Sequence, residues 1–152
     1  MGRILNLENA IREIMQSIGL VQEKPILAAI YGYNDHGKSV LIDRLSEQLK
    51  GRWLETIGYA GAPDSSTFIR IKQQLQNNVE VYLFHCGWER FDSYTFEQNF
   101  GHEDPNILAG KILGRGVNIN IFVYNPTMRP RGIPAQLGLY DFIISNPQSI
   151  KK

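Results

Sequence analysis

Apolar residues near the start of the chain recur at intervals of three and four. The set is Ile4, Leu7, Ile11, Ile14, Met15 and Ile18, with charged and amide side chains between its members and Gly19 after it. This spacing places the apolar side chains on one face of a helix, and the glycine is a typical stop signal. We therefore predict an amphipathic helix over residues 4–18. Two roles stay open for its apolar face, namely packing against a sheet edge or contact with a second copy or another partner.

Five short apolar runs follow, and they are typical of strands. The first, residues 26–30, has no charged residue, which suits a strand buried on both faces of a parallel sheet. The others cover residues 52–59, 79–86, 117–124 and 140–145. Helical spacing lies between several of them, after residue 37, over residues 67–76 and from Asp104-Pro105 onward. The alternation predicts an α/β fold, a three-layer doubly wound and mostly parallel five-stranded sheet with an N-terminal amphipathic helix.

A glycine-rich segment joins the first predicted strand to its helix. Residues 32–39, GYNDHGKS, match G-x-x-x-x-G-K-[ST] at every fixed position, and a strand and a helix flank them as a P-loop requires. Such a loop wraps a polyphosphate with backbone N–H groups, and its glycines allow close approach of the backbone. We predict that Lys38 contacts the β- and γ-phosphates and that the Ser39 hydroxyl binds Mg²⁺. The predicted nucleotide-binding residues are Gly32, Tyr33, Asn34, Asp35, His36, Gly37, Lys38, Ser39 and Val40.

Composition narrows the function classes. With 16 Lys and Arg against 15 Asp and Glu in 152 residues, the net charge of +1 recommends neither nucleic acid nor an acidic membrane as a partner. The single cysteine, Cys86, excludes an intramolecular disulfide, and the three histidines show no zinc-type spacing. We expect a cytoplasmic protein with a nucleotide-binding domain over residues 25–148, preceded by a helix and connector over residues 1–24.

The acidic partner that a phosphotransferase needs is harder to find. A carboxylate at the end of a neighbouring strand commonly helps to hold Mg²⁺, but the third predicted strand ends in His85 and Cys86. We interpret His85 as a core histidine or a neutral polar contact, and Cys86 as an inert buried thiol. Glu89 and Glu55 are the nearest acidic alternatives, and an ordinary solvated or strand-face charge explains each of them as well.

Two further groups follow strands at the edge where open α/β sheets bind ligands. Asp64 comes after the second strand, where it could accept a proton from a substrate hydroxyl or simply cap the next helix. Arg129 and Arg131 lie in a Pro- and Gly-rich segment after the fourth strand, where they could bind a transferring phosphoryl group or lie in solvent. The predicted catalytic residues are therefore Lys38, Asp64, Arg129 and Arg131.

These residues resemble those of P-loop kinases of the uridine kinase type. The similarity covers the first strand and residues 32–39, and it resumes in the fourth strand, the arginine-bearing segment and YDFIISN, residues 140–146. It implies ATP and Mg²⁺ as cofactors, Asp64 as the base, Arg129 and Arg131 as lid arginines, and a small hydroxylated acceptor such as a nucleoside. The arginine-bearing segment is much shorter than that family's lid, and His85-Cys86-Gly87 stands where the family has an acidic residue and a glycine.

The same loop is also similar to the G-H-V-D-H-G-K-[ST] loop of translation elongation GTPases, which implies GTP. No N-K-x-D motif is present, because residues 125–128, NPTM, lack both Lys and Asp. Residues 55–58, ETIG, are only loosely similar to D-x-x-G. We therefore expect a nucleotide-binding kinase, with a non-catalytic nucleotide-binding or regulatory module and a degenerate GTPase-like switch as the alternatives.

Overall fold

The computed structural model describes residues 4–33, 35–50, 52, 54–59, 65–87, 90, 104–128 and 136–147. The strands are β1 (Ile4–Leu5), β2 (Ile26–Tyr31), β3 (Leu54–Tyr59), β4 (Val81–Cys86), β5 (Ile119–Tyr124) and β6 (Phe142–Ser145). The helices are α1 (Leu7–Leu20), α2 (Lys38–Gln48), α3 (Ser65–Leu75), α5 (Pro105–Leu113) and the short 3₁₀ helix η1 (Leu137–Leu139). Strands and helices alternate along most of the chain, as the sequence predicts.

The strands form one sheet in the order β1-β6-β5-β2-β4-β3, and every pairing among them is parallel. The predicted α/β class with a parallel sheet is confirmed, but the prediction of five strands is wrong. Ile4 and Leu5 pair with Ile143 and Ile144 of β6 instead of starting the first helix. Asn6 separates the two elements, because its side chain accepts the Asn9 N–H at 2.8 Å and caps α1.

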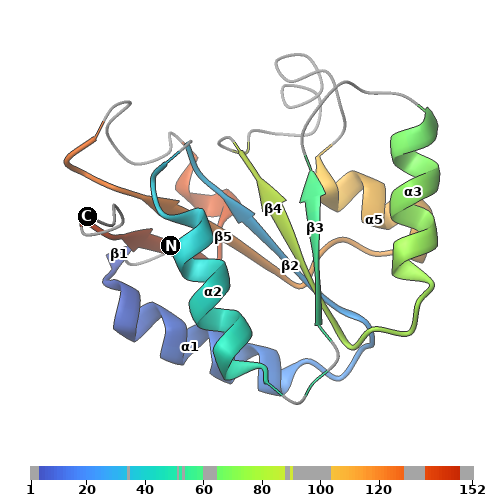
Figure 1. Cartoon of the computed structure of the whole chain (residues 1–152), viewed down its shortest axis with the longest axis horizontal. Helices are drawn as coiled ribbons and strands as arrows, with labels where there is room; N and C mark the ends of the chain where they lie inside the picture. Colours follow the sequence, from blue (N-terminus) through green and yellow to red (C-terminus); the bar gives the residue numbers. More distant parts are fainter. Residues whose placement is uncertain are drawn as a thin grey trace.

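Helices cover both faces of the sheet (Figure 1). Alternate residues of β2 belong to different cores: Ala28 and Ile30 lie with buried residues of α1 and α2, whereas Leu27, Ala29 and Tyr31 lie with those of α3 and α5. This division follows from the twofold periodicity of a strand. β2 is buried along its whole length, which explains its uninterrupted apolar sequence.

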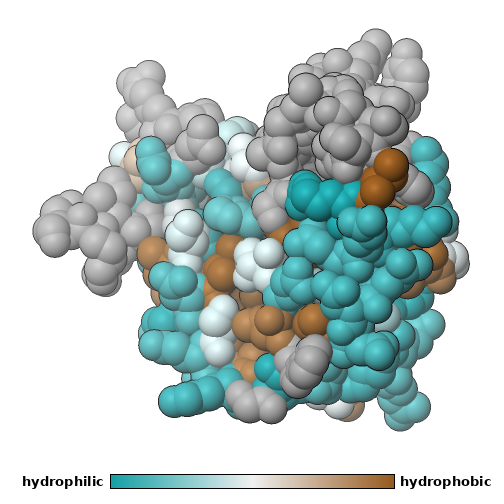
Figure 2. Space-filling model, turned by 45° about the vertical axis from the view of Figure 1, so that its right-hand side comes forward, coloured by the Kyte–Doolittle hydropathy of each residue, from teal (hydrophilic) through white to brown (hydrophobic). Residues whose placement is uncertain are grey.

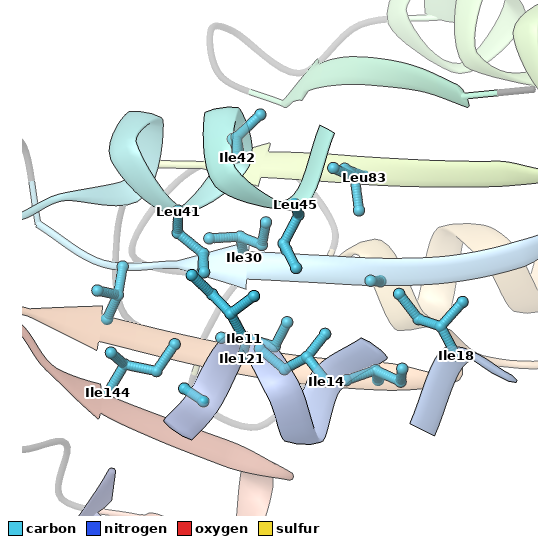
Figure 3. Close-up of a cluster of buried hydrophobic side chains, with 14 of the residues drawn as sticks. Ile11, Ile14, Ile18, Ile30, Leu41, Ile42, Leu45, Leu83, Ile121 and Ile144 are labelled. Carbon is cyan, nitrogen blue, oxygen red and sulfur yellow. The ribbon is translucent and has the colours of Figure 1, made fainter. Parts of the chain in front are cut away.

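The apolar face of α1 faces the sheet. Ile11, Ile14 and Ile18 point toward Ile30 and Ile121 of the strands and toward the side chains of α2 (Figure 3). Packing within the molecule therefore accounts for this apolar stripe, although α1 lies on a face of the sheet beside α2 and not at a sheet edge as predicted. Leu20, at the end of α1, is 80% exposed.

β2 occupies the centre of the sheet, between β4 and β5. The chain leaving β2 enters α2 on one face, whereas the chains leaving β3 and β4 lead to α3 and α5 on the other (Figure 1). Where neighbouring strands lead to helices on opposite faces, open α/β sheets form a ligand crevice outside the carboxyl ends of the strands. The topology thus places residues 32–39 at the centre of that edge.

On the face drawn in Figure 2, most of the described residues are hydrophilic, and an apolar area lies near the centre of the view. Among the described residues, no helix combines the length and the apolar character needed to span a membrane.

The contribution of α1 to the fold can be measured by truncating its buried face. Ile14 is fully buried, so Ile14→Ala is expected to lower the free energy of unfolding by about 2–5 kcal/mol, through lost burial and the cavity left behind. Leu20→Ala on the same helix serves as the control and should change it by less than about 0.5 kcal/mol. Urea titrations measure both values, and similar losses for the two variants would contradict this packing.

Candidate functional site

The glycine-rich loop starts in close contact with β5. A Cβ atom at Gly32 would overlap the carbonyl oxygen of Val123 and would also lie 3.3 Å from Cγ of Lys38. Only glycine therefore lets the chain leave β2 on this path. At the other end of the loop, Gly37 has φ 110° and ψ 13° and stands at the N-cap of α2. Asp35 between them is exposed and also has a positive φ, 66°.

The N-terminus of α2 is not capped by a side chain. The first hydrogen bond of the helix runs from the Leu41 N–H to the Gly37 carbonyl at 3.0 Å, so the preceding N–H groups of the first turn have no acceptor within the helix. The first turn also carries no acidic residue. The positive end of the helix dipole is thus left for an anion.

Lys38 is buried beneath this loop, with 5% of its surface exposed. Its Nζ donates to the carbonyl oxygens of Gly32 at 2.9 Å and Tyr33 at 2.8 Å. Burial lowers the pKa of Lys38 from 10.5 to about 8, against smaller opposing effects of Cys86 and Asp35. The two carbonyls receive two of the three ammonium hydrogens, and a negatively charged ligand would compensate the charge more completely.

His36 joins the loop to the end of β5. The side chain is fully buried, and its Nδ1 accepts the backbone N–H of Asn125 at 3.0 Å. The backbone N–H of His36 donates to the Tyr33 carbonyl at 3.2 Å, and the rings of Tyr33 and His36 meet edge to face. An acceptor at Nδ1 requires the neutral ring with its hydrogen on Nε2. The sequence predicts His36 only as one of the loop positions and gives no signal for its contact with Asn125.

Ser39 is exposed in the first turn of α2. Val40 follows it and is half-buried. Tyr33 packs edge to face against Phe122, with ring centroids 6.0 Å apart. Asn34, the remaining predicted loop residue, lies outside the described residues.

His85 stands at the end of β4, where an acidic residue is expected in a phosphotransferase. His85 pairs in the sheet with Ile30 of β2, and Ile30 precedes Gly32 by two residues. Val81 and Leu83 face the core shared with α2, so His85 lies on that same face of β4. Burial, together with the nearby charge of Lys38, lowers the pKa of His85. It is therefore a half-buried neutral imidazole beside the loop, rather than a fully buried core residue.

Cys86 points into the opposite core and is fully buried. Burial, reinforced by the charge of Asp104, raises the pKa of its thiol well above the ordinary value. Full burial and a raised pKa are typical of structural cysteines, in line with the interpretation of Cys86 from the sequence.

Of the other residues considered for the site, the structure describes Glu55 alone. Glu55 accepts a hydrogen bond from Nε2 of Gln74 at 2.7 Å, so it joins β3 to α3. Asp64, Glu89, Arg129 and Arg131 lie outside the described residues. Within the part of the chain that is described, no three His, Cys, Asp or Glu side chains gather to bind a metal. A Mg²⁺ ion that takes its oxygen ligands from Ser39, phosphate groups and water fits this site, since Mg²⁺ usually keeps several waters.

On the other face of the sheet, Asp104 anchors a buried polar cluster that the sequence does not reveal. Asp104 is the predicted N-cap of α5, which is confirmed by its acceptance of the Asn106 N–H at 2.8 Å. It is fully buried, forms an ion pair with Arg90, and accepts a hydrogen bond from the Tyr31 hydroxyl at 3.2 Å. In the sequence, only Tyr31 and Asn120, polar side chains within otherwise apolar strands, point to this buried cluster. Because Arg90 neutralises this carboxylate, we assign it a structural role.

No model of a protein family matches the chain, and no curated protein matches its sequence. The interpretation of the site therefore depends on its geometry and motif.

The close contact at Gly32 gives a first test. Gly32→Ala is expected to lower the free energy of unfolding by about 1–3 kcal/mol, because the added methyl group overlaps the Val123 carbonyl. Gly19 is the matched control, since a Cβ there has no neighbour within 4 Å and alanine favours the helix. Gly19→Ala should leave stability unchanged or raise it by up to about 1 kcal/mol. Equal effects in urea titrations would refute the contact.

The effect of the Lys38 charge on the pKa of His85 gives a second test. NMR titration should place the pKa of His85 below 6.5. In Lys38→Met this pKa should rise, because the repelling charge is gone, yet stay below 6.5 because burial persists. The unfolded chain binds more protons than the folded one in this range, so His85 also makes stability increase as the pH rises through its pKa.

The control for this titration is Lys50→Met, which removes an exposed charge just beyond the far end of α2. It should leave the pKa of His85 unchanged. An identical titration in wild type and Lys38→Met would place His85 away from the loop.

Proposed function

We propose that this protein binds a nucleoside triphosphate, ATP in the first instance, together with Mg²⁺ at residues 32–40. The observation that carries the proposal is the buried ammonium of Lys38, held by two loop carbonyls, in the first turn of a helix whose N-terminus has no side-chain cap. Both features concentrate positive potential at one point, and neither is neutralised by a carboxylate in the first turn of α2. An anion with several oxygens is the ligand that such an arrangement favours.

The loop residues have separate roles in this proposal. The backbone N–H groups of Gly37, Lys38 and Ser39 donate to phosphate oxygens, and Gly32 keeps the loop close to β5. Lys38 directs its remaining hydrogen to the β- and γ-phosphates. Mg²⁺, when bound, neutralises charge on the same phosphates, and the Ser39 hydroxyl is its ligand from this chain. The exposed Asp35 lies at the outer rim of the loop.

Phosphoryl transfer to a small hydroxylated acceptor is the activity we propose for this site. The arrangement of the sheet supports it, because β3 and β5 end at the same edge as β2 and lead toward the segments that carry Asp64, Arg129 and Arg131. In this scheme Asp64 accepts the proton of the acceptor hydroxyl, and the two arginines neutralise the transferred phosphoryl group.

A non-catalytic nucleotide-binding module is the second candidate. The observation that favours it is His85, a neutral imidazole at a strand end where a carboxylate would help to hold Mg²⁺. Such a module would bind nucleotide without transfer or hydrolysis. A GTPase-like switch has weaker support, because Asn125 uses its side-chain oxygen to bind Thr127 instead of standing in an N-K-x-D motif.

Calorimetric titration of the full chain with ATP and with GTP, each with Mg²⁺ or with EDTA, tests the binding proposal. ATP binding is expected for the wild type, and Lys38→Met should weaken it by about a hundredfold or more, because a buried charged hydrogen bond to phosphate is lost. Lys50→Met, which removes an exposed charge just beyond the end of α2, should bind ATP as the wild type does.

Absence of ATP and GTP binding in the wild type, or equal affinity in Lys38→Met, would overturn the binding proposal. Turnover is a separate question. ATP consumption in the presence of nucleosides, lost in Asp64→Asn with ATP affinity retained, would favour the kinase. Binding with no consumption of either nucleotide would favour the non-catalytic module.

A further inference from the structure

We propose that His36 is the positioning residue of the phosphate loop and couples nucleotide occupancy to the turn that follows β5. This inference rests on the proposed function, because it concerns how the same loop is held and what responds when it fills. It assigns to His36 a contact between loops rather than a contact with the nucleotide. The evidence is a chain of hydrogen bonds through three loops at the carboxyl edge of the sheet.

The first link is the bond from the Asn125 N–H to Nδ1 of His36, 3.0 Å long and buried at both ends. A buried N–H group that loses its acceptor is costly, so this bond has a strong influence on where the loop lies. His36 stands directly before Gly37, the N-cap of α2. A shift of its ring would therefore also move the N–H groups that face the phosphates.

The second link is the turn over residues 125–128. The side-chain oxygen of Asn125 accepts the Thr127 N–H at 2.9 Å and the Thr127 hydroxyl at 2.6 Å, and its carbonyl accepts the Met128 N–H at 3.1 Å. One residue, Asn125, thus organises the whole turn and also contacts the phosphate loop. The segment with Arg129 and Arg131 begins directly after this turn in the sequence.

The third link extends the coupling to the end of β6. Nδ2 of Asn125 donates to the Pro147 carbonyl at 3.4 Å, and the Asn146 N–H donates to the Tyr124 carbonyl at 2.9 Å. The loops after β2, β5 and β6 are therefore held together around Asn125. Filling the phosphate loop should tighten the contact of His36 with Asn125 and so stabilise both neighbouring turns.

The coupling can be observed first without any substitution. A through-hydrogen-bond NMR coupling between the Asn125 amide nitrogen and Nδ1 of His36 is expected in the wild type. Addition of ATP and Mg²⁺ should slow hydrogen exchange of the Asn125 and Thr127 amides. If the coupling is absent, or if ATP binds without slowing these amides, the inference is wrong.

Two variants then distinguish the hydrogen-bond acceptor of His36 from the volume of its side chain. His36→Asn can place an oxygen acceptor near the site of Nδ1, whereas His36→Leu places a methyl group there. We expect His36→Leu to weaken ATP binding by about tenfold and to abolish the slowing at Asn125, because the buried N–H loses its acceptor. His36→Asn should bind ATP within about threefold of wild type and retain the slowing.

The outcomes distinguish this inference from the proposed function. If the wild type binds neither ATP nor GTP, the proposed function fails. If the wild type binds ATP and both His36 variants bind it equally well, with equal protection at Asn125, the positioning role fails and the proposed function stands. Circular dichroism of each variant confirms that a loss of affinity does not come from unfolding, and an unfolded His36→Leu leaves the wild-type exchange experiment decisive.

Discussion

The burial of the Lys38 ammonium against two backbone carbonyls is the constraint on which the carboxyl edge of the sheet depends. Removing a cation from water is unfavourable, and the lowered pKa of Lys38, about 8, reflects that cost. The carbonyls of Gly32 and Tyr33 can reach Nζ only because the loop turns back over the end of β2. That path in turn requires glycine beside Val123. Charge, loop shape and contact with β5 are therefore one interdependent arrangement, which a polyphosphate would complete.

The two faces of the sheet divide structure and proposed chemistry between them. Lys38, Ser39 and His85 lie on the face of the sheet that α2 covers. Ser39 is exposed, and burial lowers the pKa values of Lys38 and His85. On the other face, the Arg90 and Asp104 pair is neutralised internally and holds the start of α5. A buried charge pair of this kind favours one arrangement of its elements without offering a ligand site. The central strand β2 lies between these two groups of polar residues, since its alternate side chains enter different cores.

The neutral imidazole of His85 is the main feature that distinguishes binding from turnover here. A carboxylate beside Lys38 would raise the lysine pKa and supply an oxygen ligand of the kind that Mg²⁺ prefers, whereas a neutral imidazole does neither. The loop therefore retains more uncompensated positive charge, which favours anion binding. Catalysis would then depend on acidic and basic groups from the segments after β3 and β5.

Local sequence by itself determined the α/β class, the position of most elements, the glycine-rich loop and the N-cap at Asp104, because each is encoded by neighbouring residues within one or two turns. Tertiary structure alone decided that Ile4 and Leu5 form a sixth strand, since their apolar spacing suits a helix equally well until β6 offers a partner. It also decided the contacts of His36 with Asn125 and of Arg90 with Asp104. His36 and Asn125 follow different strands, and the parallel sheet brings them together by collecting strand ends at one edge. Arg90 and Asp104 both lie between β4 and α5, and burial against Tyr31 of β2 holds that pair in place.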